Sequence, residues 1–272
     1  MSFFQWAQNP WGQEILVRIS WNLFWLAAAG GVLFVLGHLV FRATNKEGKP
    51  VAVEGPGTAN LPEKIVRHPL ASRFFHWTMS LSMFALLITG FLPVLGVHFE
   101  WLTIHWIAGL VLIGLVVFHI IHSVFFMGID NIWISSRDWK EFKQEIQHVL
   151  SGGEPPPKPG KYPVDQKMFH NLVSLFAFGV ILTGIVMLFR VDTPLFARNP
   201  YLFSESTWGL VYVLHGLSAV GLVGSTIAHV YFAVLPEKRW MTISMIAGWV
   251  TKKDYLAHHD PARWVVTKKA ES

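Results

Sequence analysis

The stretch that decides the fold is Tyr212-Val-Leu-His215-Gly-Leu-Ser-Ala-Val-Gly-Leu-Val-Gly-Ser-Thr-Ile-Ala-His229-Val-Tyr231, which contains no Lys, Arg, Asp or Glu. Over the fourteen residues from His215 to His229, an α-helix rises about 21 Å and stops about 40° short of four full turns. Both imidazoles therefore lie near one face of an apolar helix, at two depths. Ionisable side chains inside a membrane are costly and mark candidate functional sites. The stretch predicts a membrane-spanning helix with a functional histidine near each side.

The composition agrees with a membrane protein. Of the 272 residues, 52% are hydrophobic and 14% are charged, whereas a soluble domain carries about 25% charged residues. The absence of cysteine excludes disulfides, iron–sulfur ligation by this chain and covalent c-type haem attachment. The net charge of +5 needs no nucleic-acid partner, because membrane topology explains where the basic residues lie.

Five segments are long and apolar enough to cross a bilayer. We place them at residues 15–41, 74–95, 102–127, 168–189 and 210–235. They predict an all-α integral membrane protein, with a four-helix bundle over residues 74–235 and one extra helix within residues 1–47. Residues 48–73 are expected to be a linker, and residues 236–272 a tail.

The basic residues between the segments set the expected orientation. Nineteen of the 22 Lys and Arg residues fall in residues 42–73, 128–167 and 236–272. The positive-inside rule then places the N-terminus outside and the C-terminus in the cytoplasm. We expect the first segment to be kept rather than cleaved as a signal, because it has no basic start and its apolar run is long. Residues 138–150 are charged and amphipathic, which predicts a surface helix.

A weak internal repeat relates the second and third segments to the fourth and fifth. In each half a Thr-Gly pair, Thr89-Gly90 or Thr183-Gly184, follows a histidine by thirteen residues. The next segment of each half carries two histidines fourteen residues apart. The histidines at matched places are His76, His105 and His119 in the first half, and His170, His215 and His229 in the second. The repeat predicts a duplicated bundle.

Topology sorts these six histidines by depth. His105 and His215 fall near the outer face and make one unambiguous pair of imidazoles. The other four fall near the inner face, where geometry alone permits either His119 or His76 to pair with His229. Two pairs of imidazoles at two depths are what two bis-histidine haems require. Histidines at matched depths favour haem over ordinary hydrogen-bonded core residues.

Several motifs of this chain occur together in one known family. They are Arg73-Phe-Phe-His76-Trp with Thr89-Gly90, Ile104-His105-Trp-Ile-Ala-Gly109, Gly160-Lys-Tyr-Pro-Val-Asp-Gln-Lys-Met168, Leu182-Thr-Gly184, Phe189-Arg190, the His215/His229 helix and His258-His259-Asp-Pro261-Ala-Arg-Trp264. Through them, residues 64–264 resemble the cytochrome b (gamma) subunit of membrane-bound formate dehydrogenases and the related subunits of thiosulfate reductases and hydrogenases. The motifs are specific together rather than singly.

The resemblance implies a four-helix bundle with two b haems, to which the segment at 15–41 is an addition. The implied iron ligands are His105 and His215 for the outer haem, and His76 and His229 for the inner haem, with His119 as the alternative inner ligand. Arg73 and Arg190 are expected to pair with haem propionates, because Arg binds carboxylates bidentately.

The resemblance also implies a quinone, menaquinone or ubiquinone, beside the inner haem. The expected contacts are Asp165, Gln166, His170 and His229. The family loop there usually reads Lys-Tyr-Asn-Ala-Gly-Gln-Lys, and its Asn and Gly line the pocket. This chain has Pro163 and Asp165 in those two places. Asp165 or His170 is therefore expected to replace a polar contact and relay protons.

The expected function is electron transfer between a partner enzyme and quinone in a bacterial inner membrane, with no catalytic residue in this chain. The implied partners are an iron–sulfur beta subunit and a molybdenum or tungsten catalytic subunit, with formate dehydrogenase as the expected complex. The alternatives are a thiosulfate reductase or hydrogenase subunit, a stand-alone di-haem reductase and a haem-free transporter with proton-relaying histidines. The run from His258 to Pro261 is expected either to contact a partner's helical tail or to be a solvated tail.

Overall fold

The structure, a computed structural model, describes residues 2–44, 52, 58–127 and 131–266. Residues 48–51 and 53–57 of the linker expected over residues 48–73 therefore lie outside the described residues. The chain forms two compact units. Unit 1 comprises Met1–Phe41, Thr78–Val117 and Leu172–Tyr231, and unit 2 comprises Arg42–Trp77, Phe118–Asn171 and Phe232–Ser272.

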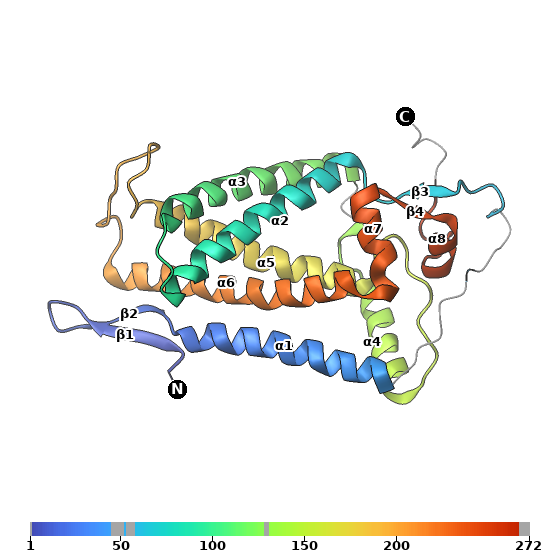
Figure 1. Ribbon diagram of the computed structural model, residues 1–272, viewed down its shortest axis with the longest axis horizontal. Helices are drawn as coiled ribbons and strands as arrows, with labels where there is room; N and C mark the ends of the chain where they lie inside the picture. The colour runs from blue at the N-terminus through green and yellow to red at the C-terminus, as the bar shows by residue number, and fades with distance from the viewer. Residues whose placement is uncertain (1, 45–51, 53–57, 128–130, 267–272) are drawn as a thin grey trace. The chain divides into compact units, whose positions relative to one another are not determined.

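The described residues include five helices long and apolar enough to cross a membrane, as predicted (Figure 1). Their side chains face outward: at most 17% of the most apolar stretch of each helix is buried. Leu81 and Leu175, for example, are 73% and 66% exposed. Such extensive apolar exposure suits hydrocarbon surroundings, and the helical backbone satisfies its own hydrogen bonds there. The chain is an all-α integral membrane protein. The spans are α1 (Trp21–Thr44), α2 (Leu70–Phe91) with η1 (Leu92–Leu95), α3 (Trp101–His122) with η2 (Ser123–Met127), α5 (Val164–Leu188) and α6 (Glu205–Val234).

The first span begins at Trp21 rather than at residue 15, because a hairpin precedes it. Strands β1 (Phe4–Gln8) and β2 (Glu14–Ile19) pair antiparallel. The Asn9 side chain closes the turn by accepting hydrogen bonds from the backbone N–H groups of Trp11 and Gln13 at 3.0 and 2.9 Å. The apolar residues that seemed to begin a helix are thereby paired as a strand.

Unit 1 packs helices closely where small residues permit it. The hairpin lies against α6, where a Cβ added to Gly209 would sit 1.7 Å from the Leu16 carbonyl oxygen. Helix α5 lies against α6, where a Cβ added to Gly179 would sit 2.2 Å from Oγ of Ser218. Helices α2 and α3 meet where Ser82 donates a hydrogen bond to the Ala108 carbonyl at 2.7 Å.

In unit 2 the C-terminal segment is folded and partly buried rather than a solvated tail. Strand β3 (Lys64–Val66) pairs antiparallel with β4 (Trp249–Thr251). Ile65, Val250, Tyr255 and Leu256 form a buried cluster. Because Tyr255 and His259 are 0% and 1% exposed, the expectation of a solvated tail is wrong. The other helices of unit 2 are α4 (Ser136–Ser151), η4 (Pro236–Lys238), α7 (Arg239–Ala247) and α8 (Lys252–His258).

Candidate functional site

Two histidines predicted to pair lie together inside unit 1. His105 of α3 and His215 of α6 have ring centroids 6.3 Å apart, with the ring planes at 61°. A metal held by two opposed imidazoles at a metal–nitrogen distance of about 2.0 Å would place the centroids about 6.3 Å apart. The observed separation therefore fits one metal atom between the rings.

A threonine sets the proton on His105. The Thr89 hydroxyl lies 2.6 Å from the Ala85 carbonyl oxygen, one turn earlier in α2, and 2.8 Å from Nδ1 of His105. A hydroxyl has one proton to donate. Because the Ala85 carbonyl can only accept, the hydroxyl donates to it and accepts from Nδ1–H of His105. Nε2 is then left with its lone pair, as a metal ligand requires.

The second half of the bundle repeats this arrangement. The Thr183 hydroxyl donates to the Gly179 carbonyl at 2.5 Å and lies 2.9 Å from Nδ1 of His215. His215 therefore has the same tautomer as His105. The sequence repeat had marked both threonines without giving them this role.

Glycines next to the two threonines leave space beside the rings. A Cβ added to Gly90 would lie 3.7 Å from Cε1 of His105, and one added to Gly184 would lie 3.6 Å from Cε1 of His215. A longer side chain at either place would extend towards the imidazole. Two oriented imidazoles flanked by glycines suit a flat macrocycle that supplies the other ligands of its iron. The pair therefore fits a haem.

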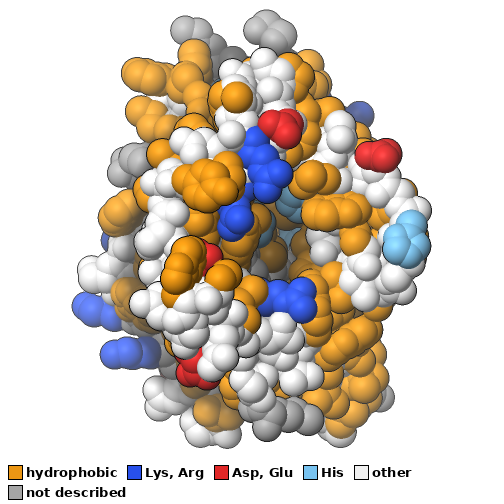
Figure 2. Space-filling view, turned by 90° about the vertical axis from the view of Figure 1, so that its left-hand side faces the viewer, with side chains coloured by type: hydrophobic (Ala, Val, Ile, Leu, Met, Phe, Trp, Pro, Cys, Tyr) orange, Lys and Arg blue, Asp and Glu red, His pale blue; other side chains and the backbone are white. Residues whose placement is uncertain are grey.

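Arg190 lies at the end of unit 1 that holds the His105–His215 pair. Its guanidinium is 5.1 Å from the ring centroid of Trp208 and 5.7 Å from that of Tyr212, within cation–π range. Figure 2 looks onto the end of unit 1 that carries the hairpin and shows Lys and Arg side chains around a hollow with histidine inside it. The basic residues of unit 1 are Arg18, Arg190 and Arg198. The same unit also holds four acids, Glu14, Glu100, Asp192 and Glu205. The candidate partner of an anionic group is therefore Arg190, whose charge rests on two aromatic rings, rather than the end of the unit as a whole.

In unit 2 the structure brings His119 and His170 together. Their ring centroids are 6.0 Å apart at 52°, and the His119 ring stacks on Phe75 with centroids 4.1 Å apart. Nδ1 of His170 is buried without a hydrogen-bond partner in the described part of the chain. That nitrogen is available to a bound group.

The other two predicted inner ligands belong to different units. His76, in the second turn of α2, belongs to unit 2, where its ring makes an edge contact with Trp77 at 5.2 Å. His229 belongs to unit 1. The pairing of His76 with His229 stays a prediction, and so does the alternative role of His119.

Arg73 is anchored but keeps an open donor. Its Nη1 donates to the Ile246 carbonyl at 2.8 Å, beside the turn at Gly248. Its Nε is buried and has no partner among the described residues. A buried unpaired N–H is costly, so this atom fits an anionic group such as a propionate.

The three expected quinone contacts at the start of α5 have different environments. Asp165 is exposed and accepts a hydrogen bond from the Gln166 backbone N–H at 2.8 Å. The Gln166 side chain accepts from Nη2 of Arg67 at 3.3 Å. Gln166 and His170 are four residues apart, so they share one side of α5. The structure thus groups Gln166 with His170 and leaves Asp165 at the surface.

A buried arginine was missed by sequence reasoning. Arg67 is 1% exposed, and its guanidinium lies 4.9 Å from the Trp240 ring centroid and 2.8 Å, through Nη1, from Nε2 of His259. Burial lowers the pKa of Arg67 to about 10 and, together with the charge of Arg67, the pKa of His259 to about 3. At neutral pH the imidazole is therefore uncharged, donates Nδ1–H to the Gly160 carbonyl at 2.7 Å and accepts from Arg67.

The histidine motif near the end of the chain was the one signal for this cluster. In the sequence Arg67 looked like another loop cation, and His259 looked solvated. Their burial depends on β3, α7 and α8 folding together, which no local pattern indicates.

These features are those of a multi-pass membrane protein in which a pair of histidines from different helices fits a haem. The family model described as prokaryotic cytochrome b561 matches residues 67–248, about two thirds of the chain. The chain belongs to this family of transmembrane b-haem electron-transfer proteins. Comparison with curated proteins finds no match.

Proposed function

We propose that the chain is the membrane-anchor cytochrome b subunit of a formate dehydrogenase complex in a bacterial inner membrane. It would accept electrons from an iron–sulfur beta subunit, itself fed by a molybdenum or tungsten catalytic subunit, and deliver them to menaquinone or ubiquinone. The observation that carries the proposal is the His105–His215 pair with its matched threonines. The identity of the complex rests on the motif resemblance.

Residues of unit 1 would hold the outer cofactor. Haem, when bound, supplies reversible one-electron transfer. His105 and His215 would provide the axial nitrogens, and Thr89 and Thr183 would hold those nitrogens unprotonated. Arg190, whose charge rests against aromatic faces, would pair with a propionate. The donor subunits would bind on the same side, with the N-terminus periplasmic and the C-terminus cytoplasmic.

His76 and His229 are the proposed ligands of the second haem, and substitution tests them. We expect His76→Ala and His229→Ala each to leave one haem of two, while His119→Ala keeps both. Loss of one haem in both His119→Ala and His170→Ala would instead assign the inner site to the pair that lies 6.0 Å apart.

Residues at the start of α5 would serve quinone. Gln166 and the open Nδ1 of His170 would contact its carbonyl oxygens, together with His229. Reduction of a quinone to a quinol takes two electrons and two protons. The exposed carboxylate of Asp165 would pass protons from the cytoplasmic side. Proton uptake on the cytoplasmic side, together with proton release by the oxidation on the outer side, would make the complex half of a redox loop.

The test is purification of the chain from its native membrane with its partners. We expect two b haems per chain and co-purification of iron–sulfur and molybdenum or tungsten subunits. Formate should reduce the haems, as followed by their absorbance spectrum. Reduction by hydrogen, or electron delivery to thiosulfate, would assign the chain to the related complexes. An active single chain without partners would establish a stand-alone reductase. A purified chain without haem would exclude an electron-transfer function.

A further inference from the structure

Helix α4 turns apolar side chains outward. These side chains recur at helical spacing and share one face: Trp139, Phe142, Ile146, Val149 and Leu150. Trp139 is 49% exposed, Ile146 41% and Leu150 80%. A helix on a water-facing surface would turn this face to the protein. The outward apolar face of α4 therefore needs an apolar covering.

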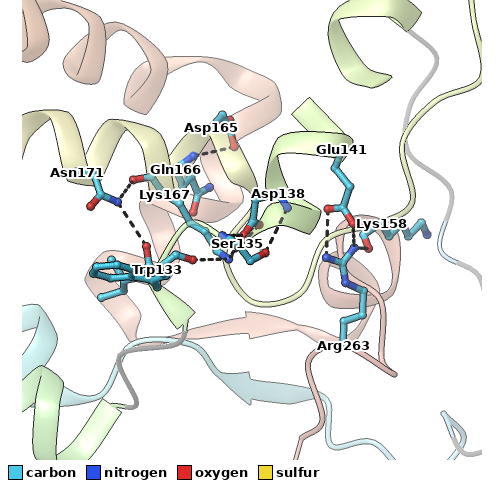
Figure 3. A network of polar contacts seen from close by, with 11 residues as sticks. Trp133, Ser135, Asp138, Glu141, Lys158, Asp165, Gln166, Lys167, Asn171 and Arg263 are labelled. Carbon is cyan, nitrogen blue, oxygen red and sulfur yellow. Dashed lines mark hydrogen bonds and ion pairs between the residues drawn. The ribbon is translucent and has the colours of Figure 1, made fainter. Parts of the chain in front are cut away.

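On one flank of that face, two acids are paired with cations of the protein. Asp138 pairs with Lys167 at 3.0 Å, and Glu141 pairs with Arg263 at 3.0 Å (Figure 3). Burial alone would raise the pKa of Asp138, but hydrogen bonds from Ser135 and the Lys167 ammonium outweigh it and lower that pKa. Both acids thus lie against cations of unit 2.

The other flank is basic and open. Lys140 and Lys143 are exposed, and because they are three residues apart they lie on one side of the helix. With Asp138 and Glu141 paired, the outward surface of α4 is apolar, and Lys140 and Lys143 give it a positive border on one side. That pattern is typical of helices that lie in the plane of a membrane surface.

Contacts with α5 fix the depth of α4. Lys167 Nζ also donates to the Trp133 carbonyl at 3.3 Å, and Asn171 Nδ2 donates to the Ile132 carbonyl at 3.4 Å. Lys167 and Asn171 lie about 5 and 10 Å along α5 from its first residue, inside the span that begins at Val164. Because these contacts lie in the first turns of a helix long and apolar enough to cross a membrane, the chain leading into α4 lies close to the membrane surface on the side of unit 2, where interfacial helices sit.

The segments that precede α4 also expose aromatic side chains. Phe125 and Phe126, at the end of the preceding span, are 75% and 77% exposed, and Trp133 is 68% exposed. In Figure 1, α4 runs across the direction of the first turns of α5 rather than along it. A helix that crosses the direction of a membrane-spanning helix, and that follows exposed aromatic residues, has the orientation of a helix lying in the membrane plane.

We propose that α4 is an interfacial helix that binds anionic lipid in the leaflet on the side of unit 2. Its apolar face would enter the acyl boundary, and Lys140 and Lys143 would contact anionic headgroups. Lipid is favoured over a protein partner because the chain leading into α4 is tied to the first turns of a spanning helix and because exposed lysines border the apolar face. This proposal does not depend on which complex the chain serves.

The test uses the whole chain, whose lack of cysteine lets single cysteines be spin-labelled. Ile146→Cys and Leu150→Cys would be compared with the exposed neighbour Gln147→Cys in nanodiscs of phosphatidylglycerol and phosphatidylethanolamine. We expect labels at 146 and 150 to collide with oxygen and to be shielded from a water-soluble nickel reagent, and the label at 147 to behave oppositely. Equal access to nickel at all three positions would overturn the proposal. If the labels were shielded only when a partner subunit is bound, the apolar face of α4 would be covered by protein rather than by lipid.

A second arm tests the charges. Lys140→Gln with Lys143→Gln should reduce the enrichment of phosphatidylglycerol around the protein, by up to about fivefold for each lysine. Arg198→Gln, in unit 1, is the control and should leave it unchanged. Equal enrichment in the double variant and the parent would overturn the assignment of these lysines to lipid.

Discussion

Nδ1 of His105 donates its proton to the Thr89 hydroxyl, 2.8 Å away, because that hydroxyl gives its own proton to the Ala85 carbonyl. The direction of this bond matters for an iron ligand. An acceptor on the far nitrogen of an imidazole increases the basicity of the coordinating nitrogen and fixes the ring. The same bond recurs between His215 and Thr183.

Removing the threonine hydroxyl should change the redox potential while keeping the haem. Valine has the shape of threonine without the acceptor, so Thr89→Val should make His105 a weaker donor to iron. We expect the outer haem to remain bound and its midpoint potential to rise by tens of millivolts, as measured by redox titration. Thr183→Val should do the same through His215.

Ser82→Ala is the control for that experiment. Ser82 ties α2 to the α3 backbone at 2.7 Å without touching a histidine. Its loss should lower stability slightly and leave the potential unchanged. A potential shift as large as that of Thr89→Val would mean that helix packing, not the bond to His105, sets it.

Two glycines of α6 should respond oppositely to alanine. At Gly209 a Cβ would lie 1.7 Å from the Leu16 carbonyl oxygen, whereas at Gly224 nothing lies within 4 Å of it. Gly209→Ala should therefore displace the hairpin and cost about 2 kcal/mol. Gly224→Ala should be neutral or stabilise by up to about 1 kcal/mol. Thermal unfolding in detergent and protease cleavage of the hairpin measure both, and equal behaviour of the two variants would refute the close contact.

Breaking the ion pair of α4 should release that helix locally. Lys167→Met leaves Asp138, which is 4% exposed, without its cation, and such losses cost about 3 kcal/mol. Hydrogen exchange of the α4 amides should quicken, while exchange in α6 should not. Adding Asp138→Asn should recover part of the protection, because the uncompensated charge is then removed. No recovery would mean that Lys167 acts through its contact with Trp133.

Unit 2 should become less stable as pH falls from 7.5 to 5.5. Burial, together with the charge of Arg67, lowers the pKa values of His68 and His259 to about 3. The unfolded chain, with a histidine pKa of about 6.5, then binds protons that the folded chain refuses, so acid favours unfolding. Each histidine should contribute about 1 kcal/mol of loss over this range.

Amide hydrogen exchange in β3 and β4 measures this pH dependence. His259→Asn should flatten the dependence, even though it also lowers stability at pH 7.5. His98→Asn, in the exposed turn between α2 and α3, is the control and should leave the dependence as it is. An unchanged slope in His259→Asn would show that other groups carry it.

The sequence predicted what depends on periodicity and spacing. Apolar runs gave five spans, and the matched histidine spacing gave the His105–His215 pair, because a helix converts spacing into position. The hairpin before Trp21 was missed because its second, apolar strand ends at Ile19 and runs almost directly into the apolar helix that begins at Trp21, while the turn at Asn9 lies between the two strands. The buried Arg67 could not be predicted, because its aromatic and histidine neighbours come from segments far apart in the chain.

The close contact between Gly209 and the Leu16 carbonyl makes one residue a marker for a whole segment. A helix without the hairpin could carry almost any side chain at that place, since nothing would occupy the space. A helix that packs against the hairpin backbone must have glycine at that place, because no side chain fits there. Among related chains, glycine at this position should therefore accompany the N-terminal addition, so its presence or loss could be traced from a single column of an alignment.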